Sequence, residues 1–438
     1  MPSPYFAEAW TVGSGPSLRI STTSTLERGK RLSSPDSPMS QDVVVENGSP
    51  ELCFSTVRVE DNWACLDSEI ETLFSSLENP NPYFSPEWLR CWLKWSNKEQ
   101  KPFAAIVRDG HGELRAFWPF VEKKGFLGAR GLWPYLNNEA NYFDPLGFPE
   151  AIPSLVKGVH GLLGDYHFIW TSLLRDSFWT NHLAPVLTES KAPCLLRIAR
   201  KTCLADLNSF SSFDEYLSDR LGAKSKKSLR YSERRLLDLG GVTFERHSDP
   251  EGIRSMLPAT CLVEVNSWKG PAIAGLYSVR GKRAFFFELL PALAEKGRAV
   301  ASCLRVEGFA VSWELGLLWQ NGSAYGLHNL AYDEDWKLHS PGKQLLVHNL
   351  AASHAAGRSV DFLPGHLDYK QKFATRTEPV RELHWFRRSA RGFLARKLIL
   401  LNMRIRRRLM AKAKGRAYAA FHQNLDKYLG AFPVDSKE

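Results

Sequence analysis

The chain has 438 residues, 44% of them hydrophobic and 12% aromatic, which is enough for two domains with ordinary cores. Its seven cysteines are odd in number and scattered without a CxxC pair, and its twelve histidines show no HExxH-like spacing. This pattern argues against a disulfide framework and against a zinc site. We therefore expect a reducing cytoplasm and no metal.

The N-terminal segment, residues 1–50, is rich in Ser, Thr, Gly and Pro and is predicted to be disordered. It contains no apolar stretch of signal-peptide length. No run in the chain approaches the ~20 apolar residues that span a bilayer. These features predict a cytoplasmic protein.

The first half of the ordered chain predicts a helix, a hairpin, a loop, a second helix and a strand. Ser85 is placed to cap a helix that begins at Pro86. The strands of Phe103–Lys124 surround an Asp-Gly turn, a hairpin signal. A loop over 141–148, a helix over about 150–163 and a strand from Tyr166 follow.

The middle segment, Phe213–His247, is predicted to be amphipathic and helical, with leucines on one side and six Lys/Arg on the other. The residues favour a solvated basic face. The alternative is that this face lies over a cofactor cleft and meets phosphate groups.

The second half repeats the order of the first. Three strands are predicted over Ala301–Asp333, around Glu307-Gly308 and a second Gly turn. A Pro-Gly turn at Pro341 then leads into an apolar helix, followed by the buried strand RSVDFL and another helix. The amides at the start of the apolar helix, with its dipole, form a suitable seat for a phosphate.

An ordered set of segments resembles the CelD-type branch of the GNAT acyltransferase superfamily, which is associated with cellulose and exopolysaccharide biosynthesis. The segments are FSPEWL at Phe84, LGAKSKKSLRYSERRLLDLGGVTF at Leu221, VEVNSWKG at Val263, KRAFFFELLPALAEKGRAVASCLRVEG at Lys282, AYDEDWKLHSPGKQLL at Ala331 and DFLPGHLDYKQKF at Asp361. The resemblance covers roughly residues 54–385.

The resemblance implies an α/β (α+β) fold of two tandem GNAT-like lobes, with mixed sheets flanked by helices, as in Fem-type transferases. We place the N-terminal lobe at 51–205, the acyltransferase lobe at 206–385 and a basic arm at 386–438. The family would wedge an acyl-coenzyme A (acyl-CoA) between two splayed strands, here AYGLHNLAYD and RSVDFL. The expected pyrophosphate loop is Ser340, Pro341, Gly342, Lys343, Gln344 and Leu345, which keeps one Gly of the usual signature.

The resemblance also suggests the catalytic residues. Tyr369 would be the acid for the thiolate leaving group, since a phenol of pKa about 10 suits a thiolate of pKa about 8–9; the alternative is a Tyr packed under the sheet. Lys370 would bind a phosphate or an acidic group, or is a solvated helix residue. Asp361 is either a structural cap or orients a nucleophile or Lys370.

A second wall of the site is expected from the turn after Glu264. Glu264 is a candidate general base, and Trp268 and Lys269 are candidates for the acceptor pocket; alternatively Gly270 closes a helix there. Tyr332 and Asp333 would lie near the mouth. His328 is on the same strand, but a lone His in such a strand is more often a satisfied interior group.

The C-terminal arm is the basic part of the chain. Between Arg387 and Arg416 there are twelve Lys/Arg and no Asp or Glu. The net charge of the whole chain is +10, so the rest of the chain carries 10 − 12 = −2 and is nearly neutral. Apolar residues alternate with these charges, as in a helix on an anionic membrane surface. A helix packed on the second lobe and a nucleic-acid arm are the alternatives.

Three functions follow. The first is acyl transfer from acyl-CoA to an amine or hydroxyl of an envelope polysaccharide or lipid precursor, on a sugar, polyol or lipid-amine acceptor at the inner membrane face. The second is a Fem-like aminoacyl-tRNA-dependent transferase. The third is a non-catalytic GNAT-like scaffold of a polysaccharide synthesis complex.

Overall fold

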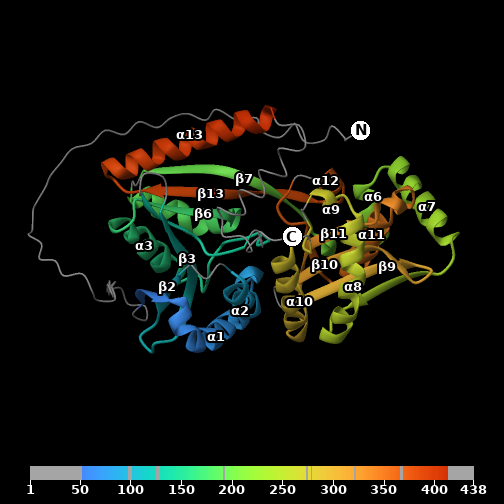
Figure 1. The fold of residues 1–438 in the computed structure, drawn as a ribbon, viewed down its shortest axis with the longest axis horizontal. Helices are drawn as coiled ribbons and strands as arrows, with labels where there is room; N and C mark the ends of the chain where they lie inside the picture. Colours follow the sequence, from blue (N-terminus) through green and yellow to red (C-terminus); the bar gives the residue numbers. More distant parts are fainter. Residues whose placement is uncertain are drawn as a thin grey trace, which may run out of the picture.

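The computed structural model describes residues 52–96, 101–124, 129–137, 139–190, 193–272, 275–277, 279–319, 322–365 and 368–412, with side chains up to residue 405. The predicted disordered segment and the last part of the predicted arm lie outside these residues. Within them the chain forms one mixed sheet of thirteen strands with helices against it (Figure 1).

The first half of the sheet comes from residues before 206. Its strands and helices run in the order β1 (Cys53–Arg58), α1 (Val59–Ser76), η1 (Pro82–Phe84), α2 (Pro86–Trp95), β2 (Pro102–Arg108), β3 (Leu114–Lys124), β4 (Arg130–Pro134), β5 (Leu146–Gly147), α3 (Ile152–Gly161), η3 (Leu162–Gly164), β6 (Phe168–Arg175), α4 (Asp176–Phe178), η4 (Trp179–Leu183), α5 (Ala184–Ser190) and β7 (Cys194–Ala205).

The second half repeats this order after a helical connection. It consists of η5 (Leu207–Ser209), α6 (Phe213–Arg220), α7 (Ala223–Leu237), β8 (Val242–His247), α8 (Pro250–Asn266), α9 (Lys269–Ala272), α10 (Arg280–Glu295), β9 (Ala299–Val306), β10 (Phe309–Trp319), β11 (Ala324–Tyr332), η6 (Glu334–His339), α11 (Pro341–Ala355), β12 (Ser359–Asp361), α12 (Asp368–Phe373), β13 (Arg376–Phe386) and α13 (Ala390–Lys412). Each half therefore has a strand, helices, three antiparallel strands, a helix, a strand and a final strand.

The two halves exchange their final strands. The sheet order is β1-β2-β3-β4-β6-β13-β7-β12-β11-β10-β9-β8. Thus β13, from the end of the second half, pairs with β6 of the first, and β7 of the first pairs with β12 of the second. The exchanged strands also pair with each other over most of their length. The two sheets that we expected are joined into one by this exchange.

Hydrophobic clusters lie within each lobe and across the boundary between the lobes. One lies in the first lobe, between β2, β3, α1 and α3. A second crosses the boundary, because Trp88 and Trp92 of α2 pack with Phe285 and Phe286 of α10. The third lies on the α11 side of the second lobe, with Leu346 and Phe362. Trp88, Trp92 and Trp118 of the first lobe are therefore buried core residues.

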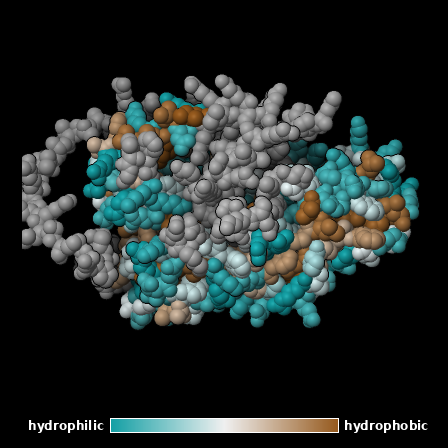
Figure 2. Space-filling view, viewed as in Figure 1, coloured by the Kyte–Doolittle hydropathy of each residue, from teal (hydrophilic) through white to brown (hydrophobic). Residues whose placement is uncertain are grey.

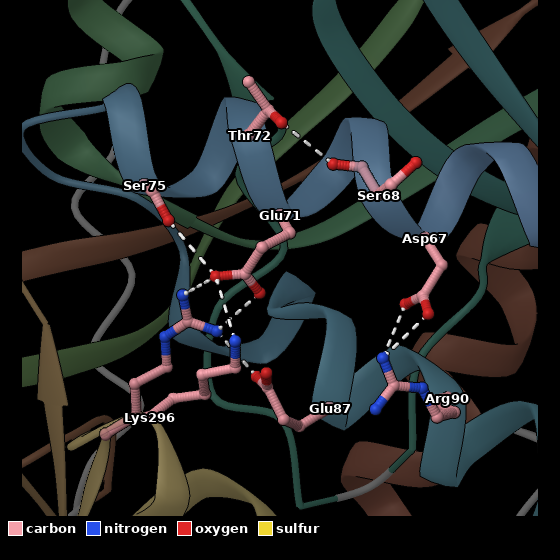
Figure 3. Close-up of polar contacts among 9 residues, drawn as sticks. Asp67, Ser68, Glu71, Thr72, Ser75, Glu87, Arg90 and Lys296 are labelled. Atoms are coloured by element: carbon pink, nitrogen blue, oxygen red, sulfur yellow. Dashed lines mark hydrogen bonds and ion pairs between the residues drawn. The ribbon is translucent and has the colours of Figure 1, made fainter.

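A buried ion-pair group also joins the lobes. The Arg298 guanidinium, just before β9, lies 2.8 Å from Glu87 of α2 and 2.8 Å from Glu71 of α1. Figure 3 shows both carboxylates turned toward the same point, with Lys296 alongside. The Glu87 side chain is only 3% exposed, so its charge depends on Arg298 for compensation.

Most predicted elements are confirmed. The Ser85 hydroxyl accepts a hydrogen bond from the Trp88 amide and caps α2, which begins at Pro86. The hairpin of β2 and β3 and the three strands β9 to β11 are present. In the predicted loop over 141–148, Leu146–Gly147 adds the short strand β5.

Two predictions need correction. Phe213–His247 is not one helical segment: Gly222 has an extended backbone that separates α6 from α7, and Gly240 and Gly241, both at positive φ, turn the chain into β8. Gly270 does not end a helix. α8 ends at Asn266, and Gly270 lies within α9, where a Cβ would meet the Val265 carbonyl oxygen at 2.2 Å.

The last helix, α13, lies along the part of the sheet that contains β7, β13 and β6 (Figure 1). Ala395 is buried and Ile399 partly buried against Phe168 and Phe386. On the opposite side four large apolar residues are exposed: Phe393, Leu394, Leu401 and Ile405. Figure 2 shows hydrophobic (brown) residues at the upper left of the molecule, where Figure 1 places part of α13.

Candidate active site

The central strands of the second lobe separate where the sequence predicts a split. β11 and β12 are parallel and pair only from Ala324↔Ser359 to Gly326↔Asp361. β11 then continues to Tyr332 without β12 beside it, while the chain leaves β12 through Leu363, a residue at positive φ. The backbone groups along this edge of β11 are thus left open to another partner.

The start of α11 stands at the end of the separated β11. Ser340 is in the left-handed region, with φ 52°, and Pro341 is the first helical residue. The amides of Lys343 and Gln344 both bond to the Ser340 carbonyl, so part of the predicted amide set is engaged in the turn. Gly342 is packed closely on Tyr332, since a Cβ there would lie 2.9 Å from that ring.

The rest of the predicted pyrophosphate loop points in several directions. The Gln344 side chain is buried and donates to Leu229 and Ser232, which ties α11 to α7. Leu345 is in the core. Lys343 is half-buried, and burial together with nearby Lys372 lowers its pKa. Lys343 is therefore the loop's cationic side chain, while Gln344 and Leu345 anchor the helix.

The basic residues of α7 lie beside this helix. One face of α7, with Leu229 and Leu236, is buried, whereas Lys224, Lys227 and Arg230 are exposed on the other. This fits the solvated basic face that the residues favoured.

Asp361 and Lys370 lie close enough at the lobe boundary to interact electrostatically. The Asp361 carboxylate accepts hydrogen bonds from the Tyr142 hydroxyl (2.6 Å), the Thr202 hydroxyl (2.7 Å) and the Leu363 amide (2.8 Å). Burial raises its pKa, although these donors oppose the rise. Asp361 thus ties the first-lobe loop and β7 to the end of β12.

Lys370 is not a solvated helix residue. It is 7% exposed and donates to the Leu363 carbonyl oxygen at 3.0 Å. Burial lowers its pKa to about 8, while the Asp361 charge acts in the opposite direction. Its ammonium group is held beside Asp361 at the base of the strand split.

Tyr369 faces a different environment from Lys370. It is half-buried against the core on the α11 side. Burial, and to a lesser extent the Glu314 carboxyl, raises its pKa above the ordinary value. A raised pKa makes Tyr369 a weaker acid than a free phenol, so it is protonated near pH 7 and gives up that proton less readily than a solvated tyrosine would.

A cavity of about 220 Å³ opens at the lobe boundary next to Asp361. Tyr142 and Arg175 of the first lobe line it together with Asp361 and Trp319 of the second. Its charged wall is internally paired, since Arg175 bonds to Asp144 and Arg376 to Asp206 and Glu378. Its lining contains two arginines and four carboxyl groups, those of Asp176, Asp206, Asp361 and Glu378, so carboxyl groups outnumber cations in it.

Glu264 sits at the start of a buried hydrogen-bond chain. One carboxylate oxygen accepts from the Tyr277 amide (2.7 Å) and the other from the Asn329 side chain (2.9 Å). The Asn329 oxygen in turn accepts from Lys269. Burial lowers the pKa of Lys269 to about 8. The chain connects α8 to β11 and fixes the Lys269 ammonium group.

The three remaining predicted residues lie further out. Asp333 caps η6 and accepts from Asn266 at 2.9 Å. Tyr332 is partly buried, and its pKa is raised by burial and by Glu334. Trp268 is 47% exposed on the surface. The structure thus groups Asp361 with Lys370 and Glu264 with Lys269, and leaves Trp268 apart.

Several polar residues at this centre escaped the sequence analysis. Tyr83, Asn141 and Tyr142 come from first-lobe loops, and no motif marks them. Glu314 is buried in β10 and accepts from the Tyr325 hydroxyl at 2.6 Å. A Glu within the apolar stretch VSWELGLLW was a signal that could have found it.

Residues 223–371, about a third of the chain, match the family model described as an acetyltransferase (GNAT) domain. The matched residues include β11, the start of α11, β12, Tyr369 and Lys370. No curated protein matches the chain.

Solved structures resemble the chain across both lobes at low identity. FemX is 12% identical, with a TM-score of 0.49 over 73% of this chain and 96% of that one. L-PGS from Bacillus licheniformis is 13% identical, with a TM-score of 0.47 over 77% and 95%. A tandem GNAT protein from the clavulanic acid biosynthesis pathway is 12% identical, with a TM-score of 0.38 over 76% and 98%. The substrates of these proteins are theirs, and nothing about this chain's substrate follows from them.

The described residues contain no group of three or more His, Cys, Asp or Glu side chains arranged to hold a metal ion. Among the same residues no helix is both long and apolar enough to cross a bilayer.

Proposed function

We propose that the protein transfers an acyl group from acyl-CoA to an amine or hydroxyl group of an envelope polysaccharide or lipid precursor. The observation that carries the proposal is the match of residues 223–371 to the GNAT domain model, together with the strands that part beyond Gly326 and Asp361. The parted edge of β11 offers backbone groups to the donor, and the start of α11 offers the Gly342 amide and the positive end of the helix dipole to its diphosphate.

The proposed chemistry is direct attack of the acceptor on the thioester. The acceptor nitrogen or oxygen bonds to the carbonyl carbon and loses its N–H or O–H proton, the bond to sulfur breaks, and the thiolate takes a proton. Tyr369 supplies the proton of the thiol from the α11 side of the strand split, and the proton lost by the acceptor restores the Tyr369 hydroxyl. Asp361 and Lys370 shape the opposite side, and Glu264 holds Lys269 in place through Asn329.

Binding of the donor is tested by thermal denaturation of the full chain with CoA and with acetyl-CoA. At a concentration near 100 Kd a ligand adds about 2.7 kcal/mol to the free energy of unfolding, which is a rise in Tm of several degrees. Lys343→Glu places a negative charge at the proposed diphosphate site and should abolish the rise. The matched control is Lys337→Glu, the same charge change at a side chain that is 68% exposed in η6.

The outcomes separate the alternatives. A rise with both CoA compounds that Lys343→Glu removes and Lys337→Glu preserves supports the proposal. A rise only with aminoacyl-tRNA would favour the Fem-like transferase, and no rise with any of them would favour a non-catalytic scaffold.

The envelope acceptor is supported by α13. Phe393, Leu394, Leu401 and Ile405 are exposed on the side away from the sheet, and Lys397 and Arg404 are exposed among them. A surface of this kind, without acidic residues between Arg387 and Arg416, complements an anionic membrane. We place the acceptor at such a membrane for this reason, and the CelD-type resemblance points to a polysaccharide precursor.

Flotation with vesicles tests the membrane part. The full chain should float with phosphatidylglycerol-containing vesicles and not with pure phosphatidylcholine. Leu401→Glu should abolish flotation, whereas Leu338→Glu, at an exposed leucine of η6, should leave it intact. Equal flotation of both variants would remove α13 from the proposal. If the full chain bound RNA and not the vesicles, the segment would be a nucleic-acid arm.

A further inference from the structure

His328 occupies an irregular position in β11, at the mouth of the strand split. Leu315 of β10 pairs with Asn329 and the next residue, Gly316, pairs with Leu327, so His328 is the extra residue of a β-bulge. It lies two residues beyond the last pair between β11 and β12. Its ring packs against aromatic rings from both lobes, with centroids 5.8 Å from Trp88 and 5.9 Å from Phe286.

The contacts of His328 with the first lobe favour one of its two neutral tautomers. The Asn141 amide nitrogen donates to the Glu139 carbonyl oxygen (3.1 Å) and to the Tyr83 hydroxyl oxygen (3.0 Å). Since the Tyr83 oxygen accepts from Asn141, its own proton is free to bond to His328 Nδ1, which lies 3.3 Å away. Nδ1 is then the acceptor, and the proton of the neutral imidazole sits on Nε2.

That Nε2–H group is buried and has no hydrogen-bond partner in the described part of the chain. A buried donor left without an acceptor costs about 1–3 kcal/mol, so its retention calls for an acceptor that arrives with a ligand. This contradicts the sequence expectation of a satisfied interior histidine.

The surroundings of His328 favour negative charge on such a ligand. Burial is the largest cause that lowers the pKa of His328 to about 4; Glu139 opposes this shift, and the ammonium groups of Lys282, Lys269 and Lys370 add to it. The imidazole therefore stays neutral near pH 7. The same three cations that disfavour a charged imidazole would stabilise a negative charge that develops beside it.

We propose that the Nε2–H group of His328 donates to the carbonyl oxygen of the thioester and stabilises the oxyanion formed during acyl transfer. As the acceptor adds to the carbonyl carbon, the π electron pair moves onto this oxygen; when the carbon–sulfur bond breaks, the pair returns. His328 keeps its proton throughout. Tyr83 is a positioning residue that fixes the tautomer from the other lobe. This inference rests on the proposed acyl-CoA-dependent function.

The test is NMR of the full chain with ¹⁵N-labelled histidine, with the His328 signal assigned by its absence from the His328→Gln variant. The unliganded protein should show His328 as the neutral Nε2–H tautomer at pH 7. Acetyl-CoA, which has the thioester oxygen, should shift the Nε2 resonance, and CoA, which lacks it, should not. Tyr83→Phe should release the tautomer into a mixture.

Turnover is measured as CoA released from acetyl-CoA by water. His328→Leu removes the donor and should slow release by about 10²–10³-fold, the usual effect of one oxyanion donor, with CoA affinity unchanged. His328→Gln can accept from Tyr83 and donate to the ligand, so it should stay within about tenfold of the wild type.

Each result has a consequence. An Nδ1–H tautomer, equal shifts with both compounds, or equal rates for the Leu and Gln variants would overturn the role of His328 and leave the proposed function standing. If neither compound changes any histidine signal or the Tm, the acyl-CoA-dependent function fails, and this inference fails with it.

Discussion

The buried carboxyl group of Glu314 gives a prediction whose size follows from the structure. Glu314 is fully buried in β10 and accepts one hydrogen bond, from Tyr325. Its second oxygen has no hydrogen-bond partner within the described residues. Burial raises its pKa from an ordinary 4.5 to about 8.

The sign of the effect follows from proton binding. Between pH 4.5 and 8 the folded protein keeps the Glu314 proton and the unfolded chain has lost it, so the stability that the protonated carboxyl contributes is lost as pH rises. The slope for one proton is about 1.4 kcal/mol per pH unit, or about 4 kcal/mol between pH 5 and 8. Glu314→Gln has nearly the same shape and carries no titratable proton.

The measurement is urea unfolding of both proteins at pH 5, 6.5 and 8 at constant ionic strength. The stability of Glu314→Gln relative to the wild type should rise by several kcal/mol from pH 5 to pH 8. Glu295→Gln, at an exposed position in α10, controls for the loss of one carboxylate. A stability difference for Glu314→Gln that does not change with pH would show that the buried carboxyl ionises normally, and would refute the reasoning.

Three further predictions concern the lobe boundary, a helix cap and the proposed acid. Arg298→Met should lower the free energy of unfolding by about 3–5 kcal/mol, because Glu87 would be left buried without its cation. Adding Glu87→Gln to this variant should restore part of the lost stability. If urea unfolding showed that the effects of the two substitutions simply add, the pairing of Arg298 with Glu87 would be contradicted. Ser85→Ala should cost about 1 kcal/mol in the same assay through the lost cap of α2, whereas Ser85→Asp should be tolerated. Tyr369→Phe should slow acyl transfer by about 10²-fold with Tm unchanged, and an unaffected rate would remove Tyr369 from the mechanism.

The parts of the fold that the sequence predicted are those with local causes. Ser85 and Pro86 define the start of α2 through one hydroxyl and one fixed φ angle. The Asp109 side chain accepts from the amides of His111 and Glu113 and so builds the turn between β2 and β3 from residues within four positions. Each feature depends on neighbours in the chain, and a pattern can therefore reveal it.

The parts that the sequence did not predict depend on distant residues. Tyr142 meets Asp361 across 219 positions and Tyr83 meets His328 across 245, and nothing near either tyrosine in the chain indicates its partner. The burial of Lys370 has the same origin, because Lys370 stands in a short helix whose sequence, DYKQKF, is polar. Only the packing of the lobes makes its neighbourhood dry.

The strand exchange explains why residues of the first lobe can serve a site on the second. Because β13 lies between β6 and β7, and β7 between β13 and β12, the lobes could separate only by breaking long antiparallel ladders. A hinge motion that opens the boundary would break these hydrogen bonds together, so we expect ligand entry to involve loops rather than whole lobes. Tyr83 can then hold the His328 tautomer, and Tyr142 the Asp361 carboxylate, with the constancy that a preorganised site needs. If the first lobe only covered the second lobe, Tyr83→Phe would leave the His328 tautomer unchanged. The effect of Tyr83→Phe on the tautomer therefore shows whether the first lobe takes part in the site or only supports it.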